Sequence, residues 1–162
     1  MKIFILLISI CVIVSSCKKT SSKDQAKIDN EIIQKYIGEN KLSATSSSNG
    51  LYYVIENQGS GTKPNSYSQV QVAYKGYLTD GTVFDQSNSS GAVFNLQSVI
   101  KGWTEGIPYF KAGGNGKLLI PSALGYGPNG TTGIPRNSVL IFDIKVIKVL
   151  WLLQTFKIII RL

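Results

Sequence analysis

The sequence predicts an α+β domain in which one short helix covers a face of a curved, antiparallel β-sheet. Val70, Val72 and Tyr74 alternate with polar or small residues, which is the period-two pattern of a strand with one buried face. The pair Asp80-Gly81 follows this strand and is a strong signal for a hairpin turn. Residues 99–107 are the helix candidate among the strands. Strands joined by turns, with one short helix among them, favour this architecture.

The remaining strands are shorter, and their positions follow from β-prone runs separated by turn signals. Asn115-Gly116 is expected to turn into the strand that follows it. Residues 122–136 are rich in Gly, Pro and Asn, and a loop of this length in a compact domain is usually functional. The expected strands are 51–55, 70–78, 83–84, 92–94, 117–120 and 139–149.

The N-terminus has the features of an export signal that ends in a lipid anchor. Lys2 precedes an almost purely apolar run that is too short to span a membrane. The tetrad Val14-Ser15-Ser16-Cys17 resembles a bacterial lipobox, which implies cleavage before Cys17 and acylation of that residue. We therefore expect residues 1–16 to be a lipoprotein signal peptide and Cys17 to anchor the mature chain in the cell envelope. Lys18 favours the outer membrane, facing the periplasm, if the cell is Gram-negative.

Residues 17–49 are expected to form the tether between the anchor and the domain. The segment 18–23 is polar, and 43–49 is a second linker rich in Ser and Thr. Between them, apolar residues recur at helical spacing and predict a helix at 24–37, with Gly38 at its C-terminal stop. This helix is expected either to pack on the domain or to pair with a partner.

Composition excludes several kinds of catalytic site. The chain has 162 residues, no His and two Cys, Cys11 and Cys17, so no His-centred triad and no imidazole metal site can form. Processing before Cys17 would leave no free thiol, and no metal or cofactor is expected. The net charge is +8, but the Lys residues are scattered rather than clustered, so no nucleic-acid partner is expected.

Several short motifs in the second half of the chain give the clearest functional signal. In order they are Val70–Asp85, Val99–Gly106, Ile120-Pro121, Tyr126-Gly127, Ile134-Pro135 and Leu140–Asp143. Together they resemble the signatures of FKBP-type peptidyl-prolyl cis–trans isomerases, and the resemblance covers residues 50–149. It implies an FKBP-like curved antiparallel β-sheet wrapped around one short helix.

The same resemblance implies an apolar pocket between the sheet and the helix. Trp103 would form its floor beneath a substrate proline ring, and the Tyr126 hydroxyl and the Ile100 backbone N–H would donate hydrogen bonds to substrate carbonyls. Asp85 would brace the pocket and polarise the twisting amide. Ser98 stands where some members of the family have an acidic residue. The implied catalytic residues are Tyr74, Phe84, Asp85, Trp103 and Tyr126, and the implied substrate-binding residues are Phe94, Val99, Ile100, Ile134 and Phe142.

The resulting functional prediction is an isomerase that assists the folding of exported, proline-containing polypeptides in the cell envelope. Isomerisation of an X–Pro bond needs no nucleophile, metal or general base, which fits the missing His and Cys side chains. The alternative is a catalytically weak FKBP-like chaperone or peptide-binding module that uses the same groove. A third interpretation is an envelope scaffold that acts through the helix at 24–37 and the C-terminal tail.

The C-terminal residues 150–162 depart from the family, whose domains usually end near Val149. This atypical tail is strongly apolar, with only four polar or charged residues as relief. Four interpretations stay open: an additional strand, an interfacial membrane segment, a partner-binding element or a misread C-terminus.

Overall fold

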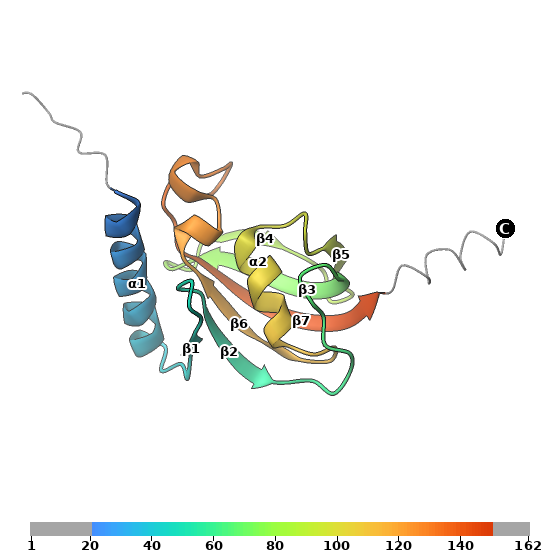
Figure 1. The fold of residues 1–162 in the computed structure, drawn as a ribbon. Coiled ribbons are helices and arrows are strands. Elements are labelled where there is room, and N and C mark those ends of the chain that lie inside the picture. The colour runs from blue at the N-terminus through green and yellow to red at the C-terminus, as the bar shows by residue number, and fades with distance from the viewer. Residues whose placement is uncertain (1–20, 151–162) are drawn as a thin grey trace, which may run out of the picture.

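The computed structural model describes residues 21–150 and places them in one antiparallel sheet with two α-helices (Figure 1). The strands are β1 Thr45–Ser46, β2 Tyr52–Asn57, β3 Gln69–Leu78, β4 Val83–Gln86, β5 Ala92–Asn95, β6 Asn115–Ile120 and β7 Leu140–Leu150. The helices are α1 Ser22–Glu39 and α2 Lys101–Gly106, with 3₁₀ turns η1 Ile107–Tyr109, η2 Ser122–Leu124 and η3 Gly127–Asn129. The strand order is β1-β2-β6-β7-β3-β4, and β5 also pairs with β3.

The predicted fold class is confirmed, because α2 lies across one face of the curved sheet (Figure 1). The strands β3 and β7 pair along their whole length, from Gln69 opposite Leu150 to Leu78 opposite Leu140. Successive side chains of a strand point to opposite faces, so alternate residues of these strands reach the helix. The core that they form with α2 includes Val70, Val72, Trp103, Ile107, Phe110, Leu118, Ile120, Leu140, Phe142 and Ile144.

Both ends of the sequence lie outside the described residues. The expected signal peptide 1–16 and the lipidation residue Cys17 precede them, and residues 151–162 of the apolar tail follow them. The anchor and the tail therefore stay predictions. Within the described part of the chain, no helix is both long enough and apolar enough to cross a membrane.

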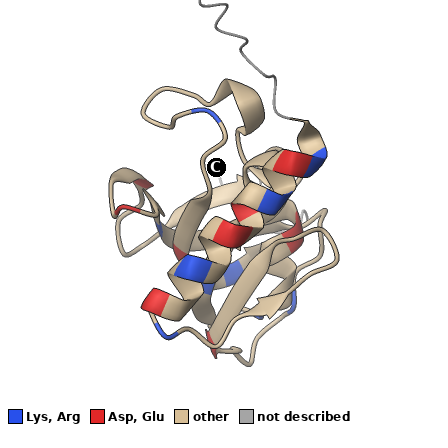
Figure 2. Ribbon diagram, turned by 90° about the vertical axis from the view of Figure 1, so that its left-hand side faces the viewer, with Lys and Arg blue, Asp and Glu red and all other residues tan. Residues whose placement is uncertain are grey.

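The outward face of α1 is a charged surface (Figure 2). Lys27 and Glu31 form an ion pair at 4.0 Å, and Lys35 and Glu39 form another at 3.7 Å, each spanning one helical turn. Exposed pairs of this kind contribute little to stability, because water and salt screen them. The position of α1 must therefore be set by its other face.

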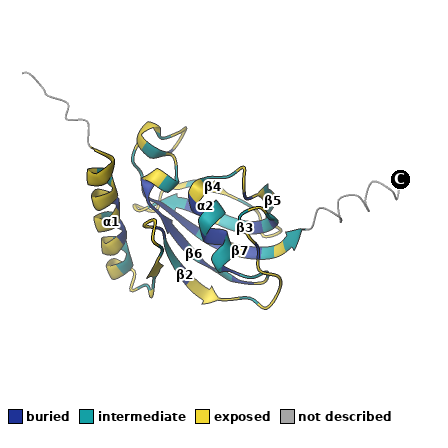
Figure 3. Ribbon diagram, in the orientation of Figure 1, coloured by how far each residue is buried: buried dark blue, intermediate teal, exposed yellow. Residues whose placement is uncertain are grey.

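The inward face of α1 is buried against the sheet (Figure 3), and the sheet residues that it contacts lie on the face opposite α2. Ile33 is fully buried there in a cluster with Leu119 and Ile141, which alternate with the main-core positions of β6 and β7. Val54 and Val139 complete this second cluster. Of the two alternatives expected for the helix, packing on the domain is the one observed.

The helix is longer at both ends than the sequence predicts. Ser21 caps its start, and its Oγ accepts a hydrogen bond from the Asp24 N–H at 3.2 Å. The predicted stop at Gly38 is wrong, because the chain leaves the helix only at Asn40, and Lys41 then adopts a left-handed backbone with φ of 52°. A glycine is favoured where a helix ends in this conformation, but it is not required.

Two segments assigned to a linker and a turn are parts of the sheet. Residues 45–46 of the second Ser/Thr-rich linker form β1 and pair with the start of β2. Asn115-Gly116 begins β6 and is not the turn before it. That turn spans residues 111–114, where the Gly114 N–H bonds to the Lys111 carbonyl and Gly113 supplies the required positive φ of 85°.

Replacement of Ile33 by alanine should destabilise the protein, because it leaves a cavity between α1 and the sheet. Large-to-alanine changes at buried sites cost roughly 2–5 kcal/mol. Ile28 lies on the same helix with 42% of its surface exposed, so Ile28→Ala is the matched control and should change stability little. Thermal melts followed by circular dichroism measure both. Equal melting temperatures for the two variants would contradict the packing of α1 described above.

Candidate active site

Nine of the ten side chains implicated from the sequence line one cavity of about 490 Å³. The cavity lies between the sheet and α2, and its wall includes the loop that follows β6. This volume is within the range of small-molecule and peptide side-chain sites. The nine are Tyr74, Phe84, Asp85, Phe94, Val99, Ile100, Trp103, Tyr126 and Phe142.

Trp103 is the centre of the aromatic cluster in this cavity, and only 4% of its surface is exposed. The ring centroids of Tyr74 and Phe94 lie 5.1 Å from the indole and that of Phe142 lies 5.3 Å away, with interplanar angles of 76° to 87°. Edge-to-face pairs of this kind each add roughly 0.5–1.5 kcal/mol beyond burial. The indole Nε1 has no hydrogen-bond partner among the described residues, so packing alone fixes the ring.

Gly76 on β3 makes room for two further rings of the site. A Cβ at this position would lie 2.6 Å from the Phe84 ring and 2.7 Å from the Phe142 ring. Without that atom, the two rings meet edge to face over the strand, with centroids 5.5 Å apart. The glycine in the middle of a strand therefore has a packing role, and it fixes one side of the cavity.

Asp85 is the charged residue among those lining the cavity, and it lies at the exposed rim. Its Oδ2 accepts a hydrogen bond from the Tyr74 hydroxyl at 2.7 Å. Burial, and secondarily this hydrogen bond and the carboxylate charge, raise the pKa of Tyr74 to about 12. Tyr74 is therefore a neutral donor throughout the physiological range, and its hydroxyl holds the carboxylate in place.

Two hydrogen-bond donors at the cavity have no partner in the described part of the chain. Tyr126 caps η3 and is 40% exposed, and its hydroxyl bonds to no described residue. Ile100 caps α2, and its carbonyl accepts from the N–H groups of Trp103 and Thr104 at 2.9 and 3.2 Å. The N–H of Ile100 itself makes no hydrogen bond to any residue between 21 and 150. Both donors are thus free to meet carbonyl groups of a bound chain.

Ile134 is the predicted site residue that does not line the cavity. It is 5% exposed and belongs to the main core. Reciprocal backbone bonds of 2.9 Å between Ile134 and Thr131 close a tight turn in the loop, and this turn fixes the residue in the core. Ser98 lines the cavity instead. It directly precedes Val99, the first residue of the second signature motif, and this position could have indicated it.

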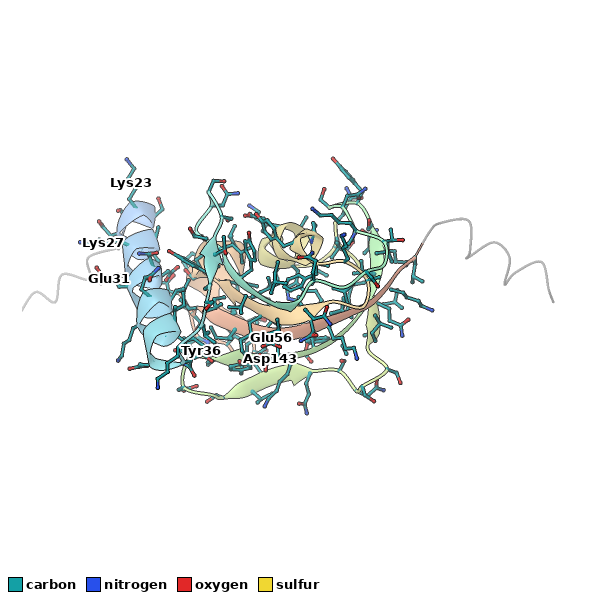
Figure 4. The ribbon with its side chains drawn as sticks, turned by 90° about the horizontal axis from the view of Figure 1, so that it is seen from below. Lys23, Lys27, Glu31, Tyr36, Glu56 and Asp143 are labelled. Atoms are coloured by element: carbon teal, nitrogen blue, oxygen red, sulfur yellow. The ribbon has the colours of Figure 1, made fainter. Side chains whose placement is uncertain are left out.

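A second hollow, of about 590 Å³, lies on the other face of the sheet, where Glu56 and Asp143 are labelled in Figure 4. Its lining is mainly polar. Lys117 bonds to Asp143, which also accepts from the Tyr77 hydroxyl at 3.0 Å. Burial, and then the hydrogen bond with Tyr36, raise the pKa of Tyr77. These groups satisfy one another and offer no aromatic floor. Nowhere in residues 21–150 do three His, Cys, Asp or Glu side chains gather in a way that could hold a metal ion.

Comparison with known proteins agrees with this fold. A family model described as FKBP-type peptidyl-prolyl cis-trans isomerase matches residues 60–147. The isomerase FkpA of Escherichia coli K12 is 42% identical over 140 residues, which are 83% of this chain and 51% of that protein. FkpA of Aeromonas hydrophila is 38% identical over 141 residues, 81% of this chain and 53% of that protein.

Solved structures give the same result. The crystal structure of FkpA from Escherichia coli matches with a TM-score of 0.69 and 40% identity, over 78% of this chain and 61% of that one. A peptidyl-prolyl cis-trans isomerase from Pseudomonas syringae pv. tomato matches with a TM-score of 0.71 and 30% identity, over 81% of this chain and 97% of that one. The chain belongs to the family of FKBP-type peptidyl-prolyl cis–trans isomerases. It spans about half the length of the FkpA proteins that it matches.

The raised pKa of Tyr74 gives a pH dependence that can be measured. A phenol whose pKa is about 12 in the folded chain and near 10 in the unfolded chain stabilises the fold below pH 10, and this contribution is lost as the pH rises from about 10 to 12. Tyr74→Phe should therefore lose less stability over that interval than the parent. Denaturant unfolding at pH 8, 10 and 11 measures the difference. Parallel curves for parent and variant would contradict the assigned shift.

Proposed function

We propose that this chain catalyses the cis–trans isomerisation of X–Pro peptide bonds in the aromatic cavity. The observation that carries the proposal is the cage of edge-to-face rings around Trp103, with unpaired donors from Tyr126 and Ile100 beside it. A proline ring is apolar and compact and fits a floor of this kind. The substrates are proline-containing segments of polypeptides that are not yet folded.

The chemistry of the bond explains why such a cavity accelerates its rotation. The barrier of about 18–20 kcal/mol is the loss of amide resonance, and uncatalysed X–Pro isomerisation takes tens to hundreds of seconds. The planar amide is a stronger dipole than the twisted one. Transfer from water to an apolar cavity therefore raises the energy of the ground state more than that of the transition state, which is differential binding.

The polar groups of the site complete this mechanism. The Tyr126 hydroxyl and the Ile100 N–H orient the chain by donating to carbonyls on either side of the proline, since neither has a partner among residues 21–150. The Tyr74 hydroxyl donates to the Asp85 carboxylate at 2.7 Å and holds it in place. The carboxylate then presents a fixed negative charge that polarises the twisting amide. None of these steps transfers a proton.

We also propose that the protein acts in the cell envelope, on exported polypeptides, from a lipid anchor on Cys17. The support is the tetrad Val14-Ser15-Ser16-Cys17 after an apolar run. From Cys17 only a short polar segment leads to the start of α1 at Ser22. An anchor there would hold the domain close to the membrane, in the outer membrane facing the periplasm if the cell is Gram-negative.

Loss of the Tyr126 hydroxyl tests the isomerase proposal. One hydrogen bond to substrate is worth about 0.5–1.5 kcal/mol, so Tyr126→Phe should lower kcat/KM by a few-fold to about tenfold, with stability within about 1 kcal/mol of the parent. Tyr67 is 74% exposed and does not line the cavity, so Tyr67→Phe is the matched control and should leave the rate unchanged. A protease-coupled assay on an X–Pro peptide measures the rates.

Three results of this assay are informative. A drop confined to Tyr126→Phe supports catalysis at the cavity. Equal rates for parent and both variants, all above the uncatalysed rate, would remove the proposed role of the hydroxyl. A well-folded parent with no rate above background would overturn the enzyme proposal and leave a peptide-binding module as the function of the groove.

The anchor has its own test. Cys17→Ala should abolish incorporation of labelled fatty acid and should shift the protein from the membrane fraction to the soluble fraction, because it removes the only thiol that the lipobox could modify. Cys11→Ala is the matched control, since that cysteine lies inside the expected signal peptide and should leave labelling unchanged. Continued labelling of the Cys17 variant would exclude this anchor.

A further inference from the structure

We propose that Asp29, on the N-terminal helix α1, is a positioning residue that holds the active-site loop through Ser122. Asp29 is fully buried, and Ser122 at the start of η2 is 1% exposed. They are the two buried polar residues in the described part of the chain. The inference rests on the proposed isomerase activity, because it assigns to α1 a role at the same site.

The Asp29 carboxylate makes this contact and accepts three hydrogen bonds in all. Oδ2 of Asp29 accepts from the Ser122 backbone N–H at 2.8 Å and from the Ser122 hydroxyl at 2.6 Å. Oδ1 accepts from the Gln25 side-chain amide at 2.8 Å. A buried carboxylate is costly unless donors of this number compensate it. The arrangement therefore depends on α1 and the loop keeping one relative position.

Ser122 connects this contact to the catalytic loop. Its carbonyl accepts from the Gly125 N–H at 3.0 Å, and the preceding Pro121 carbonyl accepts from the Leu124 N–H at 2.9 Å. These two bonds form the turn η2, which Gly125 ends, and the next residue, Tyr126, is the cap of η3. In Figure 1, α1 stands beside the orange segment that contains this loop.

The geometry makes Asp29 the attachment point for the start of the loop, at Ser122. A second attachment lies at Gly127, whose carbonyl accepts a hydrogen bond from the Asn137 N–H at 2.8 Å. Tyr126 lies between these two attachments, and its own hydroxyl has no partner in the described protein that would fix it. Loss of the Asp29 contact would release the loop at Ser122 and widen the range of positions of the Tyr126 hydroxyl.

A set of variants separates this coupling from loss of stability. Asp29→Ala should lower kcat/KM by about fivefold, in the range expected for one misplaced hydrogen bond to substrate. Asp29→Asn should restore most of the rate, because its amide oxygen can still accept both bonds from Ser122. Ile33→Val and Ile33→Ala weaken the packing of α1 without removing a contact of Ser122. The Ile33 variant whose melting temperature matches that of Asp29→Ala should keep the parent kcat/KM.

A double-mutant cycle identifies Tyr126 as the target of the coupling. In the Tyr126→Phe background, Asp29→Ala should have little further effect on kcat/KM, since the hydroxyl that it would misplace is already absent. Equal effects in both backgrounds would overturn the proposal. If Asp29→Ala does not fold, Ser122→Ala enters the same cycle, because it removes the hydroxyl donor and keeps the backbone bond.

Hydrogen exchange tests whether Asp29 holds the loop without a measurement of isomerase activity. In Asp29→Ala, the Leu124 and Gly125 amides should exchange at least about tenfold faster, while the amides of β7 keep the parent rate. Faster exchange at both places would indicate general destabilisation and would overturn the proposal, as would unchanged exchange in the loop. A parent without isomerase activity would remove the proposed function, and the exchange data would still show whether Asp29 holds the loop.

Discussion

The pairing of β3 with β7 is the constraint on which the remaining structure depends. It places Tyr74 opposite Ile144 and Gly76 opposite Phe142 on the face that α2 covers. A shift of one residue would exchange the two faces of each strand and send these aromatic side chains to the outside. The cavity thus exists only in this register, with β4 and β5 adding Phe84 and Phe94 from the other edge of β3.

The site combines a rigid apolar floor with few polar groups, and this balance suits the proposed isomerisation. Aromatic rings fix Trp103 from three sides, so the floor would not need to reorganise to receive the proline ring of the proposed substrate. The Tyr74 hydroxyl orients Asp85 and stays protonated far above neutral pH. A catalyst that lowers the barrier by desolvating an amide needs this stiffness more than it needs proton transfer.

How far the sequence could predict these features depends on the kind of signal behind each. Strands with a period of two and the motifs around Trp103 and Tyr126 were predictable, because their patterns are local. The stop at Gly38 was wrong because a glycine is compatible with both the interior and the end of a helix. Ile134 lies in the core because a backbone turn, invisible in composition, closes at Thr131.

The burial of Asp29 could not be predicted from the local sequence pattern, because it depends on a contact between residues far apart in the chain. On the sequence it is one of several charged residues of a polar helix, and the usual expectation for such a residue is exposure to water. Its burial is stable because Ser122, ninety-three positions away, supplies two donors and Gln25 supplies a third. A segment predicted as part of a tether therefore completes the second core cluster with Ile33 and contacts the loop that carries Tyr126. The packed unit that carries the site therefore begins with α1 and not at residue 50.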